Sequence, residues 1–253
     1  MIVAIGGKNL EVVWFGPPPE DGRVIVFLHE GLGSVSLWRD FPAALCKRAA
    51  CSGLVYSRFG HGQSDPLERP RTVDFMHEEA LAVLPALLDQ FGIRRPILFG
   101  HSDGASIAII HAGGAGREVR GLILEAPHVF VEDLTVTSIT LTKERYFTTD
   151  LRSRLGRHHA DIETLFSEWT DVWLSAPFRA WNIEQHARAI RAPVLLIQGE
   201  DDEYGTPKQA EAISAATGGK NRIVMLKRCG HTPHVDQRSK VERLAISFIR
   251  GLP

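Results

Sequence analysis

One stretch, residues 95–110, constrains the fold more than any other part of the chain. A short apolar run ends in Gly100-His101-Ser102-Asp103-Gly104, and small and apolar residues at helical spacing follow it. This pattern predicts a buried strand that turns sharply into a helix, because the two glycines allow a turn that a β-carbon would obstruct. Such a turn holds the Ser102 hydroxyl out at its tip. The N–H groups that open the helix point to the place where an oxyanion would form.

Apolar runs alternate with helical segments along the rest of the chain, which is typical of an α/β fold with a mostly parallel, doubly wound sheet. Two short runs on either side of Gly6-Gly7 predict an antiparallel hairpin at the edge of that sheet. We expect one helix from Trp38 to Ala50 and another from residue 72 or 74 to Phe91. Besides the run before Ser102, the expected strands are residues 2–5, 10–15, 23–28, 53–57, 119–124, 192–198 and 222–226.

Residues 131–190 interrupt this alternation. They carry helical and aromatic signals but no clear strand, and they far exceed an ordinary connection of about two to six residues. We therefore expect a helical lid at residues 131–190, inserted into an α/β core that comprises residues 1–130 and 191–253. The lid contains Trp169, Trp173 and Trp181, for which core packing and contact with a ligand are both possible roles.

A nucleophilic serine needs a base, and the base needs an orienting carboxylate, so the partners of Ser102 should lie at the ends of other strands. Asp202 follows the expected strand at residues 192–198, and His231 follows the last expected strand. The chain order Ser102, Asp202, His231 is one of the known orders of a serine, acid and histidine triad.

Both partners have competitors. For the acid, Asp201 neighbours Asp202, and Glu125 ends another expected strand. For the base, His234 lies three residues after His231 and is expected to bond nearby backbone or to line the site. His101 is expected to fill the space beneath the serine turn.

Together these motifs resemble the α/β-hydrolase superfamily, from the first strand of the chain to its last helix. The matching motifs, in the family's order, are His29-Glu30-Gly31, Gly60-x-Gly62-x-Ser64-Asp65, Gly100-x-Ser102-x-Gly104, Gly199-x-x-Asp202 and Gly230-His231. The resemblance implies that Ser102 is the nucleophile, that His231 is the general base and that Asp202 is its partner.

The resemblance further implies an oxyanion hole made by the backbone N–H groups of Gly31 and Asp103, although Glu30 stands where many relatives have glycine. It implies a serine hydrolase that cleaves a carboxylic ester or related acyl bond of a small molecule through an acyl-enzyme, without a cofactor. The same triad serves lactonases, amidases or aminopeptidases and hydrolases of carbon–carbon bonds. The fold also serves as a ligand receptor or a cofactor-free oxygenase, so these alternatives stay open.

Asp103 has a second possible role. The serine turn and Leu32-Gly33-Ser34 look like segments of valacyclovirase-like esterases, in which the acidic residue after the serine binds the ammonium group of an amino-acid ester. With Glu30 in the facing loop, two carboxylates would then attract a cation. The competing interpretation is that Asp103 stabilises the helix N-terminus by about 0.3–1 kcal/mol. The candidate substrate-binding residues are therefore Glu30, Asp103, Trp169, Trp173 and Trp181.

The charge balance limits the partners of the chain. Among 253 residues, 29 are basic and 30 acidic, which argues against a nucleic-acid or anionic-membrane surface.

The first residues do not resemble a signal peptide and no apolar run approaches a membrane span, so we expect a cytoplasmic protein. We expect His158 and His159 to be solvated. No metal is expected, because the three cysteines and these two histidines do not match a metal-ligand pattern. A monomer and a homodimer are both compatible with the sequence.

Overall fold

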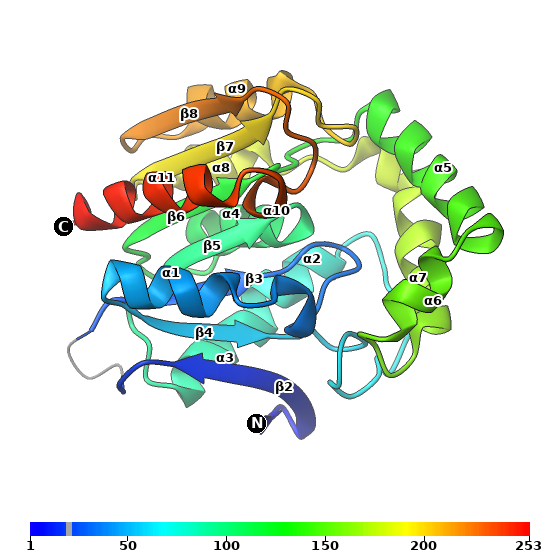
Figure 1. Ribbon diagram of the computed structural model, residues 1–253, viewed down its shortest axis with the longest axis horizontal. Helices are drawn as coiled ribbons and strands as arrows, with labels where there is room; N and C mark the ends of the chain where they lie inside the picture. Colours follow the sequence, from blue (N-terminus) through cyan, green and yellow to red (C-terminus); the bar gives the residue numbers. More distant parts are fainter. Residues whose placement is uncertain (19–21) are drawn as a thin grey trace.

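An eight-stranded sheet forms the centre of the computed structural model, which describes residues 1–18 and 22–253 (Figure 1). The strands are β1 (Ile2–Ile5), β2 (Lys8–Phe15), β3 (Val24–Leu28), β4 (Ser52–Tyr56), β5 (Ile97–His101), β6 (Gly121–Glu125), β7 (Val194–Gly199) and β8 (Asn221–Leu226). Their order in the sheet is β1-β2-β4-β3-β5-β6-β7-β8. β2 pairs antiparallel with β1 and β4, whereas the pairs from β4 to β8 are parallel. The predicted α/β fold with an N-terminal hairpin is confirmed.

The helices account for most of the remaining chain. They are η1 (Ser36–Trp38), α1 (Phe41–Ala49), α2 (Phe75–Glu78), η2 (Glu79–Val83), α3 (Leu84–Gln90), α4 (Asp103–Gly114), α5 (Asp133–Thr148), α6 (Leu151–Gly156), α7 (Ile162–Trp173), η3 (Pro177–Ala180), α8 (Glu184–Ala189), α9 (Pro207–Ala216), α10 (Pro233–Asp236) and α11 (Arg238–Arg250). In the described ranges, no helix combines the length and the apolar character needed to cross a membrane.

The sheet separates two apolar cores. In β3, Ile25 and Phe27 pack into one core, while Val24, Val26 and Leu28 pack into the other, because successive strand residues point to opposite faces. Helices α1 and α11 pack against each other over the first core, and α4 packs with α8 over the second. The parallel strands are thus covered on both faces (Figure 1), which explains their continuously apolar sequences.

Two expected helices are divided in the structure. The helix expected from Trp38 is η1 followed by α1, and Arg39, at φ 53°, separates the two. The helix expected to reach Phe91 continues through α2, η2 and α3, with a widened π-helical segment at η2. Pro85 is the second residue of α3, which follows that segment. Because proline has no N–H and crowds the preceding turn, a widened turn is the physical way to keep it inside a continuous helix.

Residues 131–190 contain α5, α6, α7, η3 and α8, and none of the eight strands. Helices α5, α6 and α7 stand beyond the carboxyl ends of the parallel strands (Figure 1). In contrast, α8 packs against α4 within the layer that covers the sheet. The division of the chain into a core and a lid with these boundaries stays a prediction.

Candidate active site

The turn at Ser102 is shaped by close approaches of the backbone. β5 runs directly into α4 through Ser102, which has a φ of 52° and a ψ of −119°. A Cβ on Gly100 would collide with the carbonyl oxygen of Gly104, and a Cβ on Gly104 would collide with the carbonyl oxygen of Leu28. Both glycines are therefore needed for steric reasons. Ser102 itself occupies a backbone region that side chains rarely adopt, a kind of strain that concentrates at functional sites.

Three of the predicted residues form a continuous hydrogen-bonded chain. The Ser102 hydroxyl lies 2.9 Å from His231 Nε2, and His231 Nδ1 lies 2.8 Å from Asp202 Oδ1. When Nδ1–H donates to the carboxylate, Nε2 is left as the acceptor for the Ser102 hydroxyl. The Asp202 carboxylate therefore favours the imidazole tautomer that a general base for a serine needs.

Asp202 is held firmly by the loop after β7. Its Oδ1 also accepts the backbone N–H groups of Tyr204 and Gly205, at 2.8 and 3.2 Å, and its Oδ2 accepts the Gln198 side-chain amide at 2.8 Å. Burial acts to raise the pKa of the Asp202 carboxyl, but His231 and the Tyr204 N–H outweigh it and leave that pKa below its usual value. Asp202 is thus an ionised partner for the imidazole, oriented by hydrogen bonds to both of its oxygens.

The competing acids and base are placed elsewhere. Asp201 is exposed, and His231 Nδ1 bonds the carboxylate of Asp202 rather than that of Asp201. Glu125 is fully buried, and its Oε2 lies 2.6 Å from His234 Nδ1. His234 was expected to bond nearby backbone or to line the site. It is instead paired with the carboxylate that was the alternative acid.

The loop after β3 carries the predicted oxyanion donor Gly31. Arg58 fixes this loop, since its Nη2 donates to the Glu30 carbonyl oxygen at 2.7 Å and its backbone N–H donates to His29 Nε2 at 3.0 Å. In the described part of the chain, no acceptor is placed to receive the Gly31 N–H. Asp103 opens α4, so its N–H has no acceptor within the helix. Both donors line the same cavity as Ser102.

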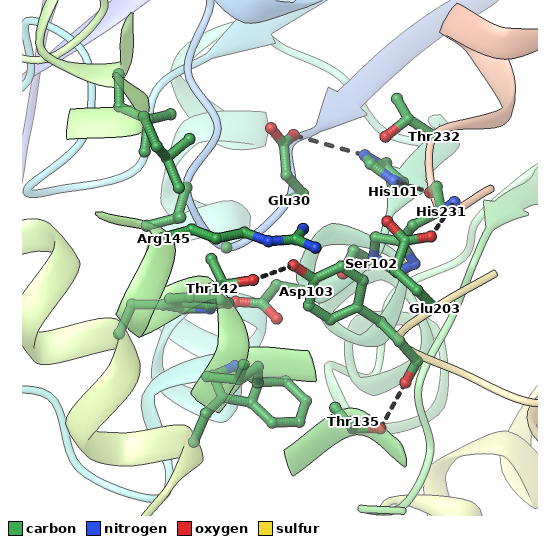
Figure 2. Close-up of a pocket in the computed structure, with 18 of the residues that line it drawn as sticks. Glu30, His101, Ser102, Asp103, Thr135, Thr142, Arg145, Glu203, His231 and Thr232 are labelled. Atoms are coloured by element: carbon green, nitrogen blue, oxygen red, sulfur yellow. Dashed lines mark hydrogen bonds and ion pairs between the residues drawn. The ribbon is translucent and has the colours of Figure 1, made fainter. Parts of the chain in front are cut away.

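Glu30, the residue that departs from the family pattern, points toward His101 (Figure 2). Its Oε2 lies 3.5 Å from His101 Nδ1, and the other nitrogen of His101 donates to the His231 carbonyl oxygen at 2.7 Å. Burial lowers the pKa of His101, but the Glu30 carboxylate more than compensates and raises it to about 9. His101 is buried, and it links the loop of Glu30 to the loop of His231.

The Asp103 carboxylate is buried beside an arginine. Its Oδ2 lies 3.9 Å from Arg58 Nη1, and neither side chain is more than 4% exposed. Burial raises the pKa of the Asp103 carboxyl, and the charges of Arg58 and Arg71 counteract this only in part. Asp103 therefore faces a cation supplied by the protein itself.

A cavity of about 450 Å³ lies between Ser102 and the helices beyond the strand ends. Its wall includes Ser102, His231, Glu30, Gly31, Asp103 and Tyr204, together with Thr142 and Arg145 of α5, Arg154 of α6, and Trp169 and Trp173 of α7. The Trp169 indole lies so close to Gly31 that a Cβ on that glycine would collide with it. Of the three predicted tryptophans, Trp181 does not line this cavity and stacks on Phe178 instead, with ring centroids 5.3 Å apart.

Several residues near the cavity were not anticipated from the sequence. Arg145 and Tyr204 line it, but the sequence shows neither which face of α5 points inward nor how the loop after β7 folds.

The expectation that His159 is solvated is wrong. His159 is buried, accepts the Gly62 N–H at 3.0 Å and donates to the Leu32 carbonyl oxygen at 2.9 Å, so it ties the chain before α7 to two loops of the core. In the described ranges, no three histidines, cysteines or acids are grouped to hold a metal ion.

The model of the alpha/beta hydrolase family matches residues 25–244. The chain is 23% identical to a proline iminopeptidase of Saccharolobus solfataricus, over 90% of this chain and 84% of that protein. A second match, to the dihydrolipoyllysine-residue acetyltransferase component of an acetoin cleaving system of Pseudomonas putida, is 31% identical but spans only 48% of this chain and 31% of that protein.

Solved structures extend the similarity to the whole fold. The enol-lactonase of Burkholderia xenovorans LB400 superposes with a TM-score of 0.78 at 19% identity, over 99% of this chain and all of that one. At this identity the likeness concerns the fold.

Proposed function

Because the chain belongs to the alpha/beta hydrolase family, we propose that it is a serine hydrolase that cleaves a carboxylic ester, or a related acyl bond, of a small molecule through an acyl-enzyme. The observation that carries this proposal is the chain from Ser102 through His231 to Asp202, with distances of 2.9 and 2.8 Å, at the wall of a cavity of about 450 Å³. A cavity of this size suits a small organic substrate.

The first half-reaction follows from the tautomer of His231. Ser102 Oγ attacks the carbonyl carbon of the substrate while His231 Nε2 takes the hydroxyl proton, and Asp202 stabilises the imidazolium that forms. The N–H groups of Gly31 and Asp103 are the donors for the oxyanion of the tetrahedral intermediate. His231 then returns its proton to the departing alcohol, which leaves the acyl group on Ser102.

The second half-reaction uses the same groups. His231 removes a proton from a water molecule, which attacks the acyl-enzyme and forms a second oxyanion at the same donors. The proton passes back to Ser102 Oγ as the acid leaves. No step requires a cofactor, because the base, the nucleophile and the oxyanion donors all belong to the chain.

Helices α5, α6 and α7 supply one wall of the cavity and would serve as the lid over this reaction. Such a lid limits the entry of water and selects the substrate by shape. Trp169 and Trp173 both line the cavity, which supports a role for them in contact with the acyl group. Trp181 does not, so we assign it to packing. Replacement of Trp169 or Trp173 by alanine should change the preferred acyl chain length, whereas Trp181→Ala should change stability alone.

The test is labelling with a fluorophosphonate probe, followed by identification of the modified peptide. An activated serine reacts with the probe, and we expect the label on Ser102 and none in Asp202→Asn. A ligand receptor or a cofactor-free oxygenase on the same fold would label poorly, and that result would contradict the proposal.

A panel of acyl p-nitrophenyl esters, lactones and proline amides then identifies the bond. The panel includes lactones and amides because the chain resembles an enol-lactonase in fold and a proline iminopeptidase in sequence. We expect the esters to be hydrolysed with the highest kcat/KM. A clear preference for lactones or amides would keep the mechanism but replace the substrate class.

A further inference from the structure

The inner acidic groups of the cavity wall already have partners within the protein. Glu30 lies 3.5 Å from His101 and Asp103 lies 3.9 Å from Arg58. Glu203, nearer the rim, accepts the backbone N–H of His231 at 3.2 Å. A substrate ammonium group would therefore have to compete with the cations that already face Glu30 and Asp103.

Arg145 is in the opposite situation. It lies on α5, lines the cavity, and extends its guanidinium into the cavity toward the side of Ser102 (Figure 2). Across residues 1–18 and 22–253, no carboxylate lies within 4.0 Å of this guanidinium and no acceptor receives a hydrogen bond from it. The other arginine of the wall, Arg154, lies 3.6 Å from Asp150.

Helix α5, which carries Arg145, is linked to the reacting groups through Tyr204. The Tyr204 hydroxyl bonds the Thr142 hydroxyl at 2.6 Å, and Thr142 precedes Arg145 by three residues, on the same face of α5. The Tyr204 ring lies 4.7 Å from the His231 ring, measured between centroids. Burial raises the pKa of Tyr204, and the charge of Arg145 is close enough to oppose that rise. The charge of Arg145 therefore acts on the side of the cavity that contains the base.

We propose that Arg145 binds a carboxylate of the substrate, so that the protein prefers esters whose acyl or alcohol portion carries an anionic carboxylate. This inference rests on the proposed function and names its substrate class. Guanidinium and carboxylate match in charge and in the geometry of two parallel N–H···O bonds. Ser102 and Arg145 both line the cavity, Arg145 as an exposed residue of its wall, so one small molecule can place its carbonyl carbon at the serine and its carboxylate at the arginine.

The experiment compares esters that differ only in charge. Monomethyl adipate is paired with the methyl ester of adipic acid monoamide, and 4-acetoxybutanoate with 4-acetoxybutanamide, so that the charge lies on the acyl portion in one pair and on the alcohol portion in the other. In the wild type we expect kcat/KM to favour the anionic member of at least one pair by about tenfold, the usual scale of one charge-assisted contact.

Variants assign this preference to Arg145. Arg145→Gln should bring the ratio of the two kcat/KM values close to one, Arg145→Lys should keep part of it, and Arg145→Glu should reverse it. Arg152→Gln is the matched control, because Arg152 lies on α6, pairs with Glu163 at 2.5 Å and does not line the cavity. The control should keep the wild-type ratio. A kcat/KM ratio of one for both ester pairs in the wild type would overturn the inference. A preference for amino-acid esters over neutral esters would overturn it as well.

A binding measurement separates this inference from the proposed function. Calorimetric titration of Ser102→Ala with monomethyl adipate needs no turnover, and the added Arg145→Gln change should weaken binding by about tenfold. Equal affinities in the two proteins would overturn the carboxylate site. Intact, Arg145-dependent binding combined with no hydrolysis of any ester by the wild type would contradict the proposed function and leave the carboxylate site standing.

Discussion

Two buried carboxylate–histidine pairs lie at the ends of neighbouring strands. After β7, Asp202 holds His231 Nδ1 at 2.8 Å, and at the end of β6, Glu125 holds His234 Nδ1 at 2.6 Å. Both histidine rings pack near the ring of His101, at centroid distances of 5.2 and 5.1 Å. The two pairs therefore share their chemistry and one neighbour.

They differ in what surrounds the rest of each imidazole. His231 presents its Nε2 to the Ser102 hydroxyl at 2.9 Å, and its side chain remains 12% exposed at the cavity. The His234 ring packs against Trp38 and Phe41, with centroids 4.6 and 5.2 Å away. A carboxylate–histidine pair can act as a base only where its second nitrogen meets a proton to move, so we assign a catalytic role to one pair and a structural role to the other.

The largest expected effect comes from removing the Ser102 hydroxyl, whose proton is available to His231 and has no counterpart beside His234 in the described part of the chain. Ser102→Ala should lower kcat by about a million-fold, as loss of a triad nucleophile does. The free energy of unfolding should change little, since the substitution deletes one hydroxyl. Steady-state kinetics and denaturant unfolding of the purified variant measure both. Retention of more than a tenth of the wild-type activity by the folded variant would remove Ser102 from the mechanism.

The second prediction compares the loss of charge at each of the candidate acids. Asp202→Asn should lower kcat by about ten-thousand-fold, because an amide favours the wrong imidazole tautomer. Asp201→Asn is the control for a neighbouring exposed carboxylate and should have a small effect, as should Glu125→Gln, which lies in the other pair. If Glu125→Gln lost more activity than Asp202→Asn, the roles that we assign to the two pairs would have to be exchanged.

The third prediction concerns stability and should give the reverse order. His234→Ala would leave the buried Glu125 carboxylate without its partner and open a space between Trp38 and Phe41, so we expect a loss of about 2–4 kcal/mol in the free energy of unfolding. His231→Ala removes a partly exposed ring at the cavity and should lose less. Urea unfolding of both variants at one pH makes the comparison. Equal losses would show that the pairs contribute alike to the fold.

This division also marks where sequence-based prediction ends. The strands were predictable because buried parallel strands are continuously apolar, and the turn was predictable because its glycines have steric reasons. The sequence placed Asp202 and Glu125 at strand ends and His231 and His234 on one loop. It could not tell which acid reaches which histidine, because that depends on loop packing around Tyr204 and Trp38.

The candidate substrate site was less accessible to prediction than the triad. The lid carries no motif, so nothing in the sequence separates Arg145, which faces the cavity, from Arg152, which does not. Likewise, Glu30 and Asp103 were predictable as acids near the serine, but not their pairing with His101 and Arg58. Those contacts join segments far apart in the chain. Because of them, the charges of Glu30 and Asp103 already face cations of the protein itself.

The smallest expected effect lies in a third carboxylate–histidine pair, Glu30 with His101, whose histidine ring packs near both of the others. Burial lowers the pKa of His101, but the effect of Glu30 is larger, and the pKa rises from the usual 6.5 to about 9. The pKa of Glu30 falls well below its usual 4.5. A histidine whose pKa is raised by folding stabilises the protein fully below the unfolded value, and this stabilisation is lost as the pH rises through the folded value. For a carboxyl with a lowered pKa, stabilisation is present above the unfolded value and is lost only in acid.

The Glu30–His101 pair should therefore stabilise the protein most between about pH 4.5 and 6.5, the two unfolded values. Its contribution should decline as the pH rises toward about 9 and disappear above it. Glu30→Gln removes the charge and keeps the shape, so it should be less stable than the wild type near pH 6, and the difference should shrink near pH 10. Asp201→Asn, an exposed acid without such a partner, should show no such trend. Denaturant unfolding across this range decides the matter, since a difference that stays constant with pH would mean that His101 is neutral. In that case His101 would hold the His231 loop by its hydrogen bond to the carbonyl oxygen alone.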